Sequence, residues 1–107
     1  MRFDVLFTPA ARTDIDDIRA YIAERDGQDR ADRISDELER ACSSLIDMPG
    51  RGNVPKELER AGGAGYRELH LRPYRIIYRV LGRRVVIFAV LDGRRDMQTL
   101  LRGRLLR

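Results

Sequence analysis

Four segments of the chain carry the apolar patterns of β-strands. Residues 2–7, 66–72 and 74–81 alternate between apolar and polar positions, which is the period of a strand with one buried face. Residues 84–91 are almost wholly apolar, so we expect this strand to be central in its sheet and covered on both faces. The short Leu81-Gly82-Arg83 connection before it predicts a β-hairpin.

Two helical patterns lie between the first and second strand segments. Apolar residues recur at steps of three and four over residues 11–22 and again over residues 31–45, so each segment has one apolar stripe. Thr8-Pro9 suits the start of the first helix, because Thr is a good N-cap and Pro fits the first helical position. The first helix should end near Asp26-Gly27, and so short a turn predicts an antiparallel helical hairpin.

The remaining segments complete the predicted order of elements. Residues 50–65 form a Gly-rich connection, which we expect to be the most mobile segment, although "PKELERA" within it is compatible with one helical turn. Residues 95–106 are compatible with a short helix that turns Leu100, Leu101 and Leu105 inward. The order β-α-α-β-β-β, with this short C-terminal helix, predicts an α+β domain in which an antiparallel sheet packs on the helical hairpin.

Composition narrows the class of protein. A length of 107 residues fits one domain, and no apolar run is long enough to cross a bilayer. Met1 leads straight into a strand pattern rather than a secretory signal, so we expect a cytoplasmic protein. The single cysteine, Cys42, excludes an internal disulfide and a zinc site built from several thiolates, and nothing in the sequence predicts a metal or cofactor.

Charge is distributed unevenly along the chain. Residues 1–65 carry ten Lys and Arg against fourteen Asp and Glu, a net charge of −4. Residues 66–107 carry eleven Arg against three acids, a net charge of +8. This segregation predicts a bipolar molecule whose basic half favours an anionic partner.

The order of elements, together with "YRELHLRPYRIIYRV" and "VLDGRRDMQTLL", resembles the RelE/ParE superfamily of toxins from type II toxin–antitoxin modules. The resemblance covers essentially the whole chain, and the Y-R-I-I-Y-R-V strand and the G-R-R-D turn are its most telling parts. It implies one of two activities. RelE-like members cut mRNA in the ribosomal A site, whereas ParE-like members share the fold and act on DNA gyrase.

The ribonuclease alternative requires a base, an acid and positive charge around the phosphate. By resemblance to RelE-like toxins, Arg75 and Arg95 would be functional, and Glu68 and His70 on one strand face could supply proton carriers. RelE-like toxins commonly carry a tyrosine after the glycine-basic turn, near Leu101 here, but no tyrosine follows Tyr78. The histidine of other relatives is also absent before this turn, where the chain reads Leu-Asp.

Each candidate residue also has a purely structural interpretation, which for His70 and Glu68 is the stronger one: polar side chains that face outward on an edge strand. Arg75 and Arg79 share their strand face with Ile77 and Leu81. A fully solvated face rarely carries both aliphatic residues, so we expect an antitoxin or the chain's own C-terminal segment to cover part of it.

Two features favour the ParE-like branch: the absence of the tyrosine and histidine that RelE-like toxins carry, and the presence of the G-R-R-D turn. ParE-like toxins bind gyrase and have no active site of their own. The resemblance then implies an adjacently encoded ParD-like antitoxin that forms a hetero-oligomer with the toxin. It implies neither membrane binding nor sequence-specific DNA binding by the toxin alone. The residues expected to contact gyrase are Arg94, Arg95, Arg102, Arg104 and Arg107. The residues expected to contact the antitoxin are Leu45, Ile46, Arg75, Ile77 and Arg79.

Overall fold

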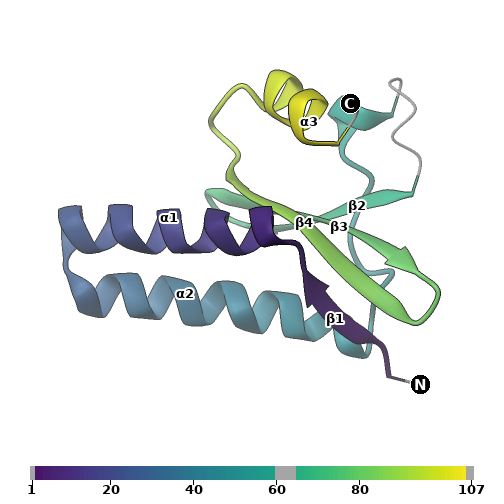
Figure 1. Cartoon of the computed structure of the whole chain (residues 1–107), viewed down its shortest axis with the longest axis horizontal. Coiled ribbons are helices and arrows are strands. Elements are labelled where there is room, and N and C mark those ends of the chain that lie inside the picture. Colours follow the sequence, from purple (N-terminus) through teal and green to yellow (C-terminus); the bar gives the residue numbers. More distant parts are fainter. Residues whose placement is uncertain (1, 60–64, 106–107) are drawn as a thin grey trace.

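The computed structural model describes residues 2–59 and 65–105, and it confirms the predicted α+β architecture (Figure 1). A four-stranded sheet has a long helical hairpin on one side and a short C-terminal helix on the other (Figure 1). In chain order the elements are β1 (Asp4–Phe7), α1 (Pro9–Asp26), α2 (Gln28–Ser43), η1 (Ser44–Ile46), η2 (Lys56–Leu58), β2 (Tyr66–Leu71), β3 (Tyr74–Leu81), β4 (Arg84–Asp92) and α3 (Met97–Leu105). None of the described helices is both long and apolar enough to span a membrane.

The strand order in the sheet is β1-β4-β3-β2, so the apolar strand β4 is central as predicted. Strands β2, β3 and β4 form an antiparallel meander, whereas β1 pairs with β4 in parallel. The sheet is therefore mixed, and the prediction of an antiparallel sheet holds for the last three strands only. The periodicity of residues 2–7 could not reveal this, because a half-buried strand alternates in the same way in either direction.

The helical hairpin packs on one face of the sheet and forms the larger part of the core. The Thr8 hydroxyl accepts a hydrogen bond from the Ala11 backbone N–H at 3.1 Å, which caps α1 at the predicted position. The turn to α2 is made by Gly27, whose φ of 97° favours glycine. The buried residues of this cluster are Ala11, Ile15, Leu38, Cys42, Leu45, Leu69, Ile76, Tyr78, Val85, Ile87 and Val90.

Helix α3 covers part of the opposite face of the sheet. The buried residues of this second cluster are Leu58, Tyr66, Ile77, Ala89, Leu91, Met97 and Leu101. The register shifts here, since Ile77 pairs with Ala89 and Tyr78 with Ile87, which leaves Phe88 as the bulged residue of β4. Both Phe88 and Ala89 consequently pack on the α3 side. Of the two covers expected for part of this face, an antitoxin or the chain's own C-terminal segment, the structure shows the C-terminal segment, in the form of α3.

The Gly-rich connection is held against the sheet over the residues that are described, while residues 60–64 lie outside them. Buried Tyr78 donates its hydroxyl hydrogen to the Pro49 carbonyl at 2.8 Å and accepts from the Gly52 N–H at 3.0 Å. A Cβ on Gly52 would lie 2.5 Å from the Glu68 carbonyl oxygen, so only glycine fits there. Asn53 then pairs with Glu68 as an isolated bridge, and the predicted helical turn appears as η2.

An ion pair joins α1 to α3 at the edge of β4. Strand β1 pairs with β4 only as far as Ile87, so the next residues of β4 have an open edge on that side. Asp14 accepts from the Val90 backbone N–H at 2.9 Å and from both terminal nitrogens of Arg104 at 3.1 and 2.9 Å. Arg104 also donates to the Phe88 carbonyl at 3.0 Å. The side chains of Asp14 and Arg104 thus satisfy backbone groups of β4 that a neighbouring strand would otherwise bind.

This arrangement predicts that Asp14→Ala lowers the free energy of unfolding by about 1–3 kcal/mol, because it leaves the Val90 N–H and the Arg104 guanidinium unsatisfied. Urea denaturation followed by circular dichroism measures the effect. Asp17→Ala is the matched control, since Asp17 is exposed on the same helix. Equal losses in the two variants would contradict a specific role for Asp14.

Candidate functional site

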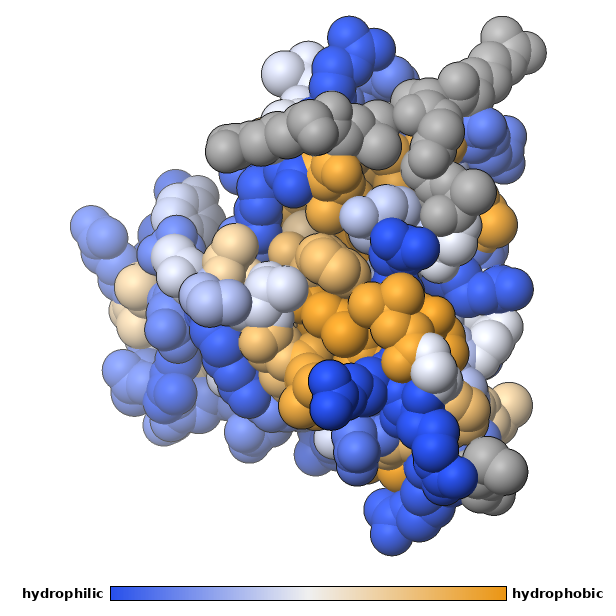
Figure 2. All heavy atoms as spheres, turned by 45° about the vertical axis from the view of Figure 1, so that its right-hand side comes forward, coloured by the Kyte–Doolittle hydropathy of each residue, from blue (hydrophilic) through white to orange (hydrophobic). Residues whose placement is uncertain are grey.

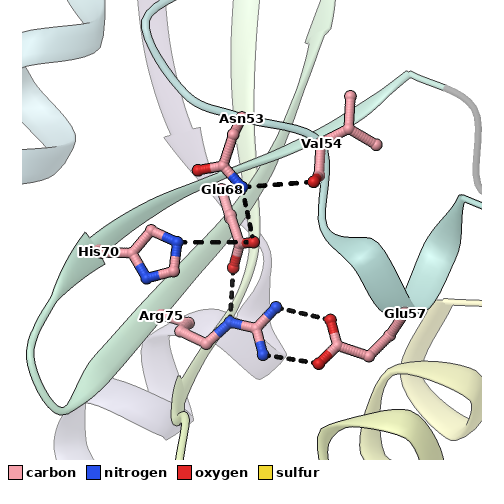
Figure 3. A network of polar contacts seen from close by, with 6 residues as sticks. All are labelled: Asn53, Val54, Glu57, Glu68, His70 and Arg75. Carbon is pink, nitrogen blue, oxygen red and sulfur yellow. Dashed lines mark hydrogen bonds and ion pairs between the residues drawn. The ribbon is translucent and has the colours of Figure 1, made fainter.

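The strongest polar cluster in the described part of the chain is centred on Arg75 of β3 (Figure 3). Its two terminal nitrogens donate to the two carboxylate oxygens of Glu57 at 2.8 and 2.7 Å, and its Nε donates to Glu68 Oε1 at 2.5 Å. Three elements meet at this one guanidinium, since Glu57 belongs to η2 and Glu68 to β2. Bonds to the two carboxylates raise the pKa of Arg75, so its charge is fixed.

Glu68 is buried, with only 3% of its side chain exposed, which corrects the prediction that it faces outward on an edge strand. Strand β2 is at the edge of the sheet, but Asn53 pairs with Glu68 along that edge, and Arg75, which is also bonded to Glu57, lies against the Glu68 carboxylate. Its second oxygen accepts from Asn53 Nδ2 at 2.9 Å (Figure 3). The cost of burying this carboxylate is offset by an ion pair and hydrogen bonds on both oxygens.

His70 lies beside this cluster at the surface. Its Nε2 is 3.6 Å from Glu68 Oε2, and half of its side chain is exposed. It lines an open hollow of about 600 Å³ whose other lining residues include Glu68, Arg72, Arg75 and Arg94. The structure therefore brings Glu68, His70 and Arg75 together, while Arg95 lines a different hollow against α1.

The cluster is poorly suited to hold a phosphate. All three side-chain nitrogens of Arg75 are already bonded to carboxylates. Arg75 together with Glu57 and Glu68 carries a net charge of −1 when all three are ionised, which repels an anion rather than attracting it. Within the described residues, no group of three or more His, Cys, Asp or Glu side chains is placed to hold a metal ion.

The glycine of the G-R-R-D turn is explained by Arg75. A Cβ on Gly93 would lie 2.7 Å from Arg75 Cδ and 3.1 Å from the Pro73 carbonyl oxygen, so a larger residue would displace the guanidinium from its partners. The Gly93 N–H donates to the Pro73 carbonyl at 2.8 Å. This motif therefore supports the ion-pair cluster.

The arginines predicted to contact gyrase differ in whether they are exposed and whether a carboxylate of the same chain already binds them. Arg94 is exposed but forms a two-point ion pair with Asp92, at 3.0 and 2.6 Å. Arg104 is held by Asp14 and is not presented as a free cation. Arg95 and Arg102 are exposed, and neither side chain forms a hydrogen bond or ion pair with another described residue. Arg107 lies outside the described residues.

The residues predicted to contact the antitoxin are also unequally accessible. Leu45 and Ile77 are fully buried in the chain's own core, so the folded protein does not present their side chains to a partner. Arg75 is only 11% exposed and is occupied by its two carboxylates. Ile46 and Arg79 remain half-buried at the surface, and contact with a partner stays a prediction for these two.

Sequence reasoning missed Glu57 and Asn53, which complete the cluster from the connecting segment. They lie 18 and 15 residues from Arg75 and Glu68, respectively, in a segment without a periodic pattern. The only signal for Glu57 was its place in "PKELERA", which predicted a helical turn but no partner. The Gly-rich composition of this connection predicts mobility and gives no sign that the segment contributes a carboxylate to the cluster.

The pH dependence of stability provides a test of the Glu57–Arg75 pair. Hydrogen bonds from Arg75 hold the pKa of Glu57 below its ordinary value of about 4.3. Glu57 therefore stabilises the fold above that pH, and its contribution is lost as the pH falls through the lower, folded-state pKa. We expect Glu57→Gln to destabilise the protein more at pH 7 than at pH 3, as measured by urea unfolding. Glu59→Gln is the control, because Glu59 is an exposed neighbour on the same segment. A loss of stability in Glu57→Gln that is the same at both pH values would refute the role of the pair.

Comparison with known proteins identifies the family. The family model described as the ParE toxin of the type II toxin–antitoxin system parDE matches residues 5–97. No curated protein matches the sequence.

Three solved structures share the fold. A chain from the chromosomal ParDE toxin–antitoxin system of P. aeruginosa superposes with a TM-score of 0.72 at 19% identity, covering 85% of this chain and 96% of that one. A chain from the RelBE2 toxin–antitoxin complex of Mycobacterium tuberculosis gives 0.61 at 24% identity, covering 86% and 92%. A mutant of the E. coli toxin RelE in the free state gives 0.62 at 12% identity, covering 94% and 93%.

These structures span both branches of the superfamily, so the shared fold does not separate them, whereas the family model that matches most of the chain is that of ParE. The chain belongs to the ParE toxin family of type II toxin–antitoxin systems.

Proposed function

We propose that this toxin acts by binding DNA gyrase and blocking its cycle, and that a cognate ParD-like antitoxin neutralises it. The family model favours this branch, and one structural observation carries the argument: each side-chain nitrogen of Arg75 donates to the carboxylate of Glu57 or of the buried Glu68. The candidate catalytic group is thus an internal ion-pair cluster. What the surface offers instead is exposed positive charge.

The basic surface suits recognition of an acidic protein. Residues 66–107 have a net charge of +8, and the exposed side chains of Arg95 and Arg102 are available to a partner. Positive charge facing an acidic surface increases the rate of association and the specificity of binding. We therefore assign gyrase contact first to Arg95 and Arg102, because Arg94 and Arg104 already have carboxylate partners within the chain.

The RelE-like ribonuclease alternative receives less support from the geometry. It would require Arg75 to leave Glu57 and Glu68 in order to face a phosphate, which would leave two buried carboxylates without their cation. Glu68, its expected proton carrier, is already bonded to Arg75 and Asn53. Among the clustered residues Glu68, His70 and Arg75, His70 is the exposed one.

A supercoiling assay with purified, antitoxin-free protein tests the proposal. We expect inhibition of ATP-dependent supercoiling by gyrase, with linearised plasmid released from trapped cleavage complexes. Arg95→Ala or Arg102→Ala should each raise the inhibitory concentration by roughly fivefold, equivalent to about 1 kcal/mol of binding free energy.

Arg33→Ala on α2 is the matched control, because Arg33 is exposed on the opposite, acidic half of the chain. Folded protein that arrests growth yet leaves supercoiling untouched would eliminate gyrase as the target. In that case His70→Ala becomes the informative variant, since loss of growth arrest in it would favour the ribonuclease.

A further inference from the structure

The open hollow beside His70 lies at the end of the sheet where β2 turns into β3. Its lining includes Val54 and Lys56 of the connecting segment and Arg72 of the turn. Lys56 and Arg72 are exposed, and neither side chain forms a hydrogen bond or ion pair with another described residue. We call this surface the Arg72 hollow.

The charges that line the Arg72 hollow favour an anionic ligand. Among its lining residues Glu68 is the one acid, and its side chain is only 3% exposed and bonded within the ion-pair cluster. Arg94 is already paired with Asp92. The exposed charges that remain for a ligand are therefore those of Lys56 and Arg72, and both are positive. Opposite charges brought together at an interface increase the rate and the specificity of association.

The backbone at the edge of the Arg72 hollow favours a polypeptide ligand over a nucleic acid. Glu68 exchanges two backbone hydrogen bonds with Asn53, at 3.1 and 2.7 Å, across the outer edge of β2. Backbone groups alternate between the two sides of a strand, so the N–H and C=O of His70 face the same edge. Neither group bonds to another described residue. A free strand edge of this kind can pair with an extended segment of another protein.

The Arg72 hollow also adjoins the surface that we assign to gyrase contact. Tyr74 and Arg94 line both this hollow and the one that contains Arg95, so the two hollows are continuous. The lining offers apolar area as well, since Val54 is 44% exposed. A segment with both acidic and apolar side chains would match this combination.

We propose that the Arg72 hollow receives an extended, acidic segment of gyrase. Its backbone would pair with His70, its carboxylates would bind Arg72 and Lys56, and an apolar side chain would cover Val54. The inference rests on the proposed function and adds a second contact surface beside Arg95. An RNA strand could place phosphates on the same two cations, but it would leave the backbone of His70 without a partner.

The opposite end of the sheet provides a matched control for the two cations. Arg84, at the start of β4, is exposed, and its side chain forms no hydrogen bond or ion pair with another described residue. Because β4 has nine residues, Arg84 lies roughly 26 Å from the Asp92 end of the strand. Figure 2 shows a hydrophobic area on the side of the molecule where the right-hand end of the sheet in Figure 1 comes forward, so the two ends differ in character.

The supercoiling assay with charge-reversed variants tests the proposal. Arg72→Glu and Lys56→Glu should each raise the inhibitory concentration by roughly tenfold, because each puts a carboxylate where the gyrase segment would bring one. Arg84→Glu makes the same change of charge and should stay within roughly twofold of the wild type. Circular dichroism confirms folding, and Lys56→Glu keeps the test valid if Arg72→Glu does not fold.

The failure of this inference can be told apart from failure of the proposed function. If the wild type inhibits gyrase and both hollow variants inhibit as Arg84→Glu does, the inference is overturned and gyrase remains the target. If the folded wild type does not inhibit gyrase, both are overturned.

Hydrogen–deuterium exchange tests the backbone contact separately. In the complex with gyrase, amide exchange in residues 68–72 should slow by roughly fivefold, because the N–H of His70 gains an acceptor, while exchange in the turn between β3 and β4 keeps its rate. A complex in which residues 68–72 exchange as in the free toxin overturns the placement. Slower exchange there with single-stranded RNA, but not with gyrase, also overturns it and indicates a nucleic-acid ligand.

Discussion

The ion pair that Arg75 forms with Glu57 and Glu68 is the interaction on which the rest of the structure depends. It ties the start of β3 to the edge strand β2 and to the connecting segment that carries η2. Buried charges stabilise a fold only when they are paired, and here one cation serves two carboxylates. Because Leu58 of η2 packs in the cluster beneath α3, the position of the C-terminal helix also depends on this cluster.

The same ion pair bears on whether Arg75 has a structural or a catalytic role. Arg75 already donates to two carboxylates within a cluster of net charge −1, which makes it poorly suited to hold a phosphate and supports the proposal that it stabilises the fold. Other positive charge lies elsewhere, on Arg95 and Arg102 near the C-terminus and on Arg79 of β3 and Arg84 of β4. These two sets of arginines lie on different elements of the fold.

The elements of the fold were largely predictable from the sequence, because each depends on local signals. Thr8 and Gly27 set the ends of α1, and the apolar run of β4 made it central. The site was less predictable. Arg75 and Glu68 were identified, but their roles depend on Glu57, whose place beneath the sheet is fixed by the tertiary fold rather than by any pattern around it. Likewise, Arg104 appeared to be a free tail arginine until the fold brought Asp14, 90 residues away, to meet it.

The central claim, that Arg75 supports the fold and does not act on RNA, is tested most directly by measuring the stability and toxicity of Arg75→Met together. We expect a loss of about 3–5 kcal/mol in the free energy of unfolding, because the buried Glu68 and its neighbour Glu57 lose their cation. We also expect the fraction of the variant that remains folded to inhibit gyrase. A variant as stable as the wild type that no longer arrests growth would contradict the account and make Arg75 a functional residue.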